Sequence, residues 1–162
     1  MFKIFNLFNF MSDFLIRFCL GIIFFNFGYG KLDNLIANEA QGLISMIESI
    51  YFFGLAPIFF SWCLALSETF LILGLIYGLF TFLPFSVLIS RLSGVIALLI
   101  SLVIMYQHIF VWGDNIFTYG PFEFLNTDEQ GKPVYGQFLF IPLSMYVIFN
   151  NRQNINLNID NK

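Results

Sequence analysis

Long apolar segments, interrupted by few charged residues, constrain this chain more than any other feature of its sequence. Between Pro57 and Leu83 the only charged side chain is Glu68, and none occurs between Phe18 and Gly30. A helix of about 20 apolar residues crosses a hydrocarbon core of about 30 Å. Only 10% of all residues are charged and 59% are hydrophobic, whereas soluble domains are about 25% charged. The sequence therefore predicts an integral membrane protein.

The apolar segments are too evenly apolar for the alternating pattern of a membrane β-barrel. We therefore predict an all-α membrane protein with a single domain over residues 1–162, built as a four-helix transmembrane bundle. The fourth segment is the shortest and contains Pro142. The predicted spans cover approximately residues 12–31, 57–83, 85–112 and 134–149.

The basic residues predict how the chain is oriented in the membrane. Five of the seven Lys and Arg residues lie on one side of the predicted spans or near it, and two, Lys31 and Lys132, lie on the other. Because basic residues concentrate on the cytoplasmic side, both termini are expected in the cytoplasm of a bacterium, with the chain in its inner membrane. Segments 31–56 and 113–135 are then outer loops, and 150–162 is a cytoplasmic tail.

The first outer loop contains a helical pattern. Apolar Leu43, Ile44, Ile47 and Ile50 recur at helical spacing, opposite polar positions that include Glu48. This spacing predicts a short amphipathic helix at the outer membrane interface.

Composition and spacing exclude several classes of site. A net charge of −3 provides no basic surface for nucleic acid. No His, Cys or acidic residues stand at metal-ligand spacing, so we expect no metal site. Cys19 and Cys63 lie on different spans at depths that differ by about 10 Å, so we expect no disulfide.

Ionisable residues inside predicted spans carry the functional hypotheses, because burying a charge in a membrane is costly. Glu68 lies about 16 Å from the outer boundary, near the midplane, and Arg17 and Arg91 enter from the inner side. Glu68 and Arg17 are the candidate catalytic residues. Lys31, Arg91 and His108 are the candidate cofactor-binding residues.

Each of these residues also has a structural interpretation. Arg17 follows Asp13 by four residues and can pair with it, and Arg91 can extend to the inner interface. Lys31 can anchor a helix end, and His108 can be structural. Glu68 at the midplane must be protonated and hydrogen-bonded, or paired with a cation.

The spacing of small and polar residues predicts which helix faces meet. Ser61, Ala65, Glu68 and Ile72 share one face of the second span, and Gly74 and Gly78 of the same span form a small-xxx-small pair for close helix contact. Turned inward, these faces would bring Glu68 within reach of Arg17 or Arg91. The corresponding inward faces of the other spans are Arg17, Gly21, Phe24, Gly28 and Lys31 on the first, and Arg91, Gly94, Leu98, Ser101, Met105 and His108 on the third.

Two of these segments resemble the signature of the DoxX-like membrane proteins. The first span has an Arg, a Gly four residues later and then Gly-x-x-Lys-Leu, and the second has Ala-x-x-Glu followed by Gly-Leu. The resemblance covers about residues 12–110 and implies a four-helix inner-membrane bundle. The matching residues are Arg17, Gly21, Gly28, Lys31 and Leu32 in the first span, and Ala65, Glu68, Gly74 and Leu75 in the second.

The resemblance implies a function, because the family takes its name from a small subunit of a quinone-linked thiosulfate oxidoreductase. One hypothesis is a membrane subunit of a quinone-dependent redox complex, with a quinone as cofactor and a protein partner. The alternative is a non-catalytic assembly protein that docks a partner through its acidic outer loops. The sequence has no haem-ligand pair, flavin motif or redox dithiol, which favours the alternative for the isolated chain.

Overall fold

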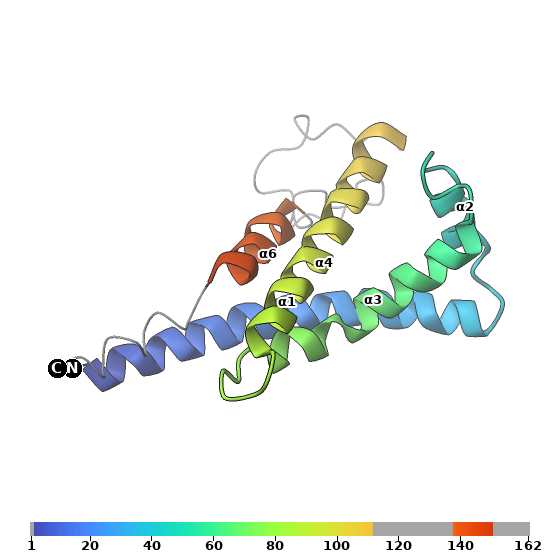
Figure 1. Cartoon of the computed structure of the whole chain (residues 1–162). Helices are drawn as coiled ribbons and strands as arrows, with labels where there is room; N and C mark the ends of the chain where they lie inside the picture. The colour runs from blue at the N-terminus through green and yellow to red at the C-terminus, as the bar shows by residue number, and fades with distance from the viewer. Residues whose placement is uncertain (1, 112–137, 151–162) are drawn as a thin grey trace, which may run out of the picture.

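The computed structural model describes residues 2–111 and 138–150, and this part of the chain is helical (Figure 1). The prediction of an all-α fold is therefore confirmed for the described residues. The helices are α1 (Phe2–Ile36), α2 (Gln41–Glu48), α3 (Pro57–Tyr77), α4 (Ser86–Tyr106), the π-helical turn η1 (Gln107–Val111) and α6 (Phe140–Phe149).

Three helices are long and apolar enough to cross a membrane, and they correspond to the first three predicted spans. Helix α1 is longer than predicted: it begins at Phe2 and ends at Ile36 rather than running over 12–31. Helix α3 ends at Tyr77, before the predicted boundary at Leu83, since turns occupy the residues that lead to Pro84. Only 28–33% of each spanning segment is buried within the protein, so the remaining apolar surface is available to lipid.

The prediction of four spans is not confirmed. Helix α6 has ten residues and is about 15 Å long, half of the about 30 Å needed to cross the hydrocarbon core. Residues 134–137 of the predicted fourth span lie outside the described residues. Pro142 falls in the first turn of α6, where a missing backbone N–H costs no intrahelical hydrogen bond. The segment 113–135, which was predicted to be an outer loop, and most of the predicted tail 150–162 also lie outside the described residues.

The predicted helix in the first outer loop is present as α2. Ile47 on this helix is buried, and Leu43 and Ile44 pack against Leu35 of α1 and Ala65 of α3. Glu48 is exposed. The apolar face of α2 therefore covers the end of the α1–α3 pair.

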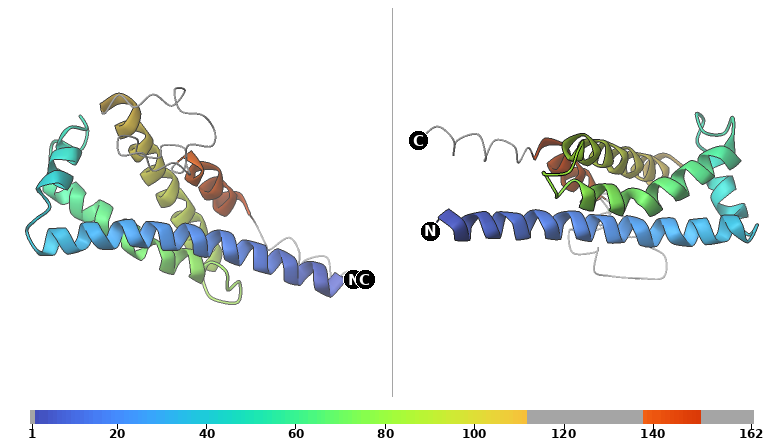
Figure 2. Two further views of the ribbon diagram at one scale, coloured as in Figure 1. Left: turned by 180° about the vertical axis from the view of Figure 1, so that it is seen from behind. Right: turned by 60° about the horizontal axis from the view of Figure 1, so that its bottom comes forward.

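Helices α1 and α3 run alongside each other in opposite directions, whereas α4 crosses them at an angle and α6 lies beside α4 (Figures 1 and 2). The connection between α3 and α4 is tight: Phe85 has a left-handed backbone, with φ of 57°, and the Tyr77 hydroxyl donates to the Pro84 carbonyl at 2.9 Å. One apolar core joins four helices, with Leu20 and Phe24 from α1, Leu71 and Leu75 from α3, Ala97 and Ile100 from α4, and Phe140 and Val147 from α6.

Candidate functional site

An ion pair connects α1 to α3 inside the helix bundle. The Lys31 ammonium donates to both carboxylate oxygens of Glu68, at 2.6 Å and 2.5 Å. Glu68 is fully buried, whereas the side chain of Lys31 is 23% exposed. The pair therefore joins a carboxylate in the protein interior to a cation that reaches the surface.

The pair forms because α1 and α3 approach each other very closely. Gly28 of α1 lies against the backbone of Thr69, and a Cβ atom placed on Gly28 would be 2.7 Å from the Glu68 Cβ. About two helical turns earlier, a Cβ on Gly21 would be 2.8 Å from the Ile72 side chain. The two glycines and Lys31 belong to the face of α1 that the spacing predicts to be inward, and that prediction is confirmed.

Arg17 is buried and pairs with Asp13 on its own helix. Its Nε donates to the Asp13 carboxylate at 2.9 Å, and its Nη1 donates to the Ser90 hydroxyl of α4 at 2.6 Å. The side-chain amide of Asn150, at the end of α6, donates to the same Asp13 oxygen at 3.2 Å. This cluster, which we call the Arg17 cluster, links α1, α4 and the end of α6.

The prediction that Glu68 reaches Arg17 or Arg91 is wrong, because Glu68 binds Lys31 and Arg17 binds Asp13. Arg17 and Lys31 are 14 residues apart on α1, or about 21 Å along its axis, so one carboxylate cannot serve both. Arg91 is exposed, so its predicted place on the inward face of the third span is wrong, whereas its alternative interpretation as an interfacial residue fits this exposure. His108 lies in η1, and its side chain is outside the described part of the chain.

The sequence did not predict Ser90 and Asn150 as hydrogen-bond partners of Arg17 and Asp13. Ser90 belongs to a series of buried serines on one face of α4, spaced by four and three residues. Such spacing of small polar residues in an apolar helix is the signal that could have identified this face. No sequence pattern indicates the hydrogen bond from Asn150 to Asp13, because that contact depends on where α6 ends.

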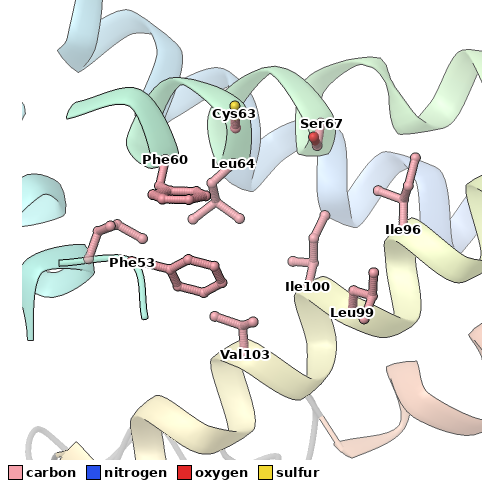
Figure 3. Close-up of a pocket in the computed structure, with 10 residues that line it drawn as sticks. Phe53, Phe60, Cys63, Leu64, Ser67, Ile96, Leu99, Ile100 and Val103 are labelled. Carbon is pink, nitrogen blue, oxygen red and sulfur yellow. The ribbon is translucent and has the colours of Figure 1, made fainter. Parts of the chain in front are cut away.

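A cavity of about 310 Å³ lies between α3 and α4, and we call it the lateral cavity (Figure 3). It arises because the two helices touch near their connecting turn, where Gly74 and Gly78 meet Ser93 and Ser90, and diverge beyond it. Its lining is almost entirely apolar. The lining residues are Phe60, Cys63, Leu64 and Ser67 of α3, Ile96, Leu99, Ile100 and Val103 of α4, and Ile47 and Phe53.

Four of the five ionisable candidates have side chains that the structure describes, and none of these four lines the lateral cavity. Lys31 and Glu68 meet on the side of α3 that faces α1, whereas Ser67, the neighbour of Glu68 in sequence, lines the cavity on the other side. Ser67 is therefore the lining residue that adjoins Glu68 in sequence, and its hydroxyl is one of the few polar groups in the lining.

The chemistry available to the two buried clusters differs. A carboxylate and an ammonium can both exchange protons, so Lys31 and Glu68 together can hold or pass one. A guanidinium stays protonated, so Arg17 can only bind and orient an anion or a hydroxyl. Among the described residues no three His, Cys, Asp or Glu side chains come together as a metal site, and Cys19 and Cys63 are both free thiols.

Comparison with known proteins identifies the family. A family model described as DoxX matches residues 12–106, which include Arg17, Lys31, Glu68 and Ser90. No curated protein and no solved structure matches the chain. The family match covers more than half of the sequence and extends over the three apolar helices that are long enough to cross a membrane. The chain therefore belongs to the DoxX family of membrane proteins.

Proposed function

We propose that this protein is the membrane subunit of a quinone-linked redox complex, located in a bacterial inner membrane with both termini in the cytoplasm. The observation that carries the proposal is the Lys31–Glu68 pair, in which a fully buried carboxylate is bound by a cation that is 23% exposed. Ionisable side chains inside a membrane span are costly, and they commonly mark proton or substrate pathways.

The proposal links this pair to quinone chemistry through protons. Reduction of a quinone to a quinol takes up two protons with two electrons, so a membrane subunit that serves a quinone needs a protonatable group within the bilayer. Lys31 and Glu68 supply such a group, and the exposed part of Lys31 connects it to the surface of the bundle. In this proposal, Glu68 takes up and releases the proton, and Lys31 pairs with its carboxylate. Arg17 positions α4 against α1 through its hydrogen bond to Ser90.

The residues that would hold a quinone are those of the lateral cavity. Its volume of about 310 Å³ falls at the small end of the range of about 300–1,000 Å³ that is usual for small-molecule sites. When bound, a quinone would supply a two-electron acceptor. The electron donor would come from a protein partner in the same complex.

The proposal is tested on the protein purified with its partners in mild detergent. We expect the assembly to reduce a short-chain ubiquinone with thiosulfate, the donor that the family resemblance suggests. Glu68→Gln should lower the rate at least tenfold at unchanged protein level, whereas Asp33→Asn, an exposed acid on the same helix as Lys31, should leave it unchanged.

Two results would contradict the proposal. One is a Glu68→Gln assembly with the full rate of quinone reduction. The other is a stable assembly with a partner but no quinone reduction by any donor tested. The second result would favour the alternative in which the chain docks a partner without catalysis.

A further inference from the structure

The lateral cavity opens on an apolar part of the protein surface, between two helices that are long and apolar enough to cross a membrane. Leu99 and Ile96, which line it from α4, are 56% and 39% exposed on an apolar helix surface that is available to lipid. Phe60 and Ser67, on the opposite wall, are half-buried. A molecule dissolved in the bilayer could therefore enter between α3 and α4 without crossing an aqueous phase.

The size and walls of the cavity restrict what it can hold. An apolar cavity of about 150 Å³ accommodates one benzene molecule, so about 310 Å³ leaves room for a six-membered ring with substituents. Leu64 from α3 and Ile100 and Val103 from α4 point toward one another across the space (Figure 3). These side chains provide the apolar surfaces between which a flat ring can pack.

One end of the cavity is aromatic. The rings of Phe53 and Phe60 lie 4.8 Å apart, tilted by 49°, and both line the cavity. Aromatic rings favour offset or edge contacts with a further ring, which adds to the gain from apolar burial. Phe53 comes from the turns after α2, so this segment contributes one wall of the site.

Polar groups in the lining are few and neutral. Ser67 supplies a hydroxyl and Cys63 a thiol, and none of the described residues that line the cavity is charged. A charged ligand would lose its hydration without gaining a countercharge, which makes its binding unfavourable. A neutral ring with one carbonyl or hydroxyl group has a partner in the Ser67 hydroxyl.

We propose that the lateral cavity binds a neutral, lipid-soluble six-membered ring compound, packed between the apolar side chains of α3 and α4 and hydrogen-bonded to Ser67. The ligand class includes the quinones, so this inference rests on the proposed function for its choice of probe and gives that function a location. It does not depend on electron transfer, because binding alone is measured.

The test uses the purified chain in lipid nanodiscs with an azido-substituted short-chain ubiquinone. Illumination should attach the probe to peptides that contain Phe60–Ser67 and Ile96–Val103, and unlabelled ubiquinone-1 should compete. Val103→Phe should fill the cavity and abolish this labelling. Leu102→Phe is the matched control, because Leu102 is the adjacent residue, is exposed and does not line the cavity.

A second variant tests the hydrogen bond. Ser67→Ala should weaken competition by ubiquinone-1 by about 2- to 10-fold, which corresponds to the loss of one neutral hydrogen bond. Thermal unfolding of all three variants should stay close to that of the parent protein, so that loss of labelling reports on the site and not on folding.

Two outcomes would overturn the inference. In one, labelling is spread over lipid-facing residues and is equal in the Val103→Phe and Leu102→Phe proteins. In the other, a photoactivatable phospholipid labels the cavity and excess ubiquinone-1 does not displace it, which would assign the space to an acyl chain. If the ring binds but the assembly reduces no quinone, the inference stands and the proposed function fails.

Discussion

The ammonium of Lys31 contacts both carboxylate oxygens of Glu68, although 37 residues separate the two in sequence. The two partners differ in exposure: Glu68 is fully buried and Lys31 is 23% exposed. Removing one partner therefore has a different consequence from removing the other, because only the lysine has a route to the surface.

We predict that Lys31→Met destabilises the protein more than Glu68→Gln does. Lys31→Met leaves an unpaired carboxyl in the interior, which should cost about 3–5 kcal/mol. After Glu68→Gln the lysine can extend toward the surface, so the cost should be about 1–3 kcal/mol. Unfolding in mixed detergent–SDS micelles measures both values. Equal losses would mean that Lys31 is confined as strictly as Glu68.

The double variant Lys31→Met, Glu68→Leu should recover much of the loss, since it removes both charges and fills their space with apolar groups. Asp33→Asn serves as the control, because Asp33 is an exposed acid two residues from Lys31. If the double variant were as unstable as Lys31→Met, the contribution of the pair would lie in packing rather than in charge.

Two glycines on α1 provide a matched test of helix contact. In Gly28→Ala the new Cβ would meet the Thr69 backbone and lie 2.7 Å from the Thr69 hydroxyl, so α1 and α3 must separate. We expect a loss of about 1–3 kcal/mol. Gly30→Ala faces open space and should be neutral or slightly stabilising. Thermal unfolding of the two variants side by side distinguishes a contact effect from a general intolerance of alanine.

We predict that replacing the Arg17 guanidinium by a lysine ammonium destabilises the protein. Arg17 donates in two directions, to Asp13 and to Ser90. Lysine has one point charge and cannot reproduce this geometry, so Arg17→Lys should cost about 1–3 kcal/mol. Arg91→Lys, at an exposed position, should change stability by less than about 0.5 kcal/mol. Equal tolerance at the two positions would show that charge alone matters at Arg17.

The orientation in the membrane is tested by labelling single cysteines in a protein that lacks Cys19 and Cys63. Glu48→Cys on α2 and Thr81→Cys in the turn after α3 are both exposed and lie beyond opposite ends of α3. With the N-terminus in the cytoplasm, an impermeant maleimide should label Glu48→Cys in intact cells and Thr81→Cys only after permeabilisation. The reverse pattern would invert the topology.

Most of the helix faces were predictable from sequence because they follow from the helical period, although Arg91, which was placed on the inward face of the third span, is exposed. Gly21 and Gly28 of α1 are buried as expected, and Gly74 and Gly78 contact α4 as their spacing indicates. The partner of Glu68 was not predictable in the same way. It depends on the register of α1 against α3: Gly28 lies against Thr69, and this places Lys31, three residues later, level with Glu68.

The lateral cavity could not be predicted because it depends on an angle between helices. Gly74 and Gly78 bring α3 and α4 together near their connection, and the crossing geometry then separates them toward Phe60 and Val103. Sequence periodicity identifies faces but does not give this angle. For this reason Ser67 could not be predicted from sequence as a residue that lines a cavity.

The positions of the ion-pair partners also matter while the chain is being made. Helix α1 is synthesised first, and Arg17 can pair with Asp13 of the same helix before any other helix has been made. Lys31 then finds Glu68 as soon as α3 arrives, without waiting for α4 or α6. Ser90 and Asn150 add their hydrogen bonds to the Arg17 cluster only later. Arg17 and Lys31 thus each meet a countercharge at the earliest stage that chain order allows, so neither has to remain an isolated ion in lipid until the end of translation.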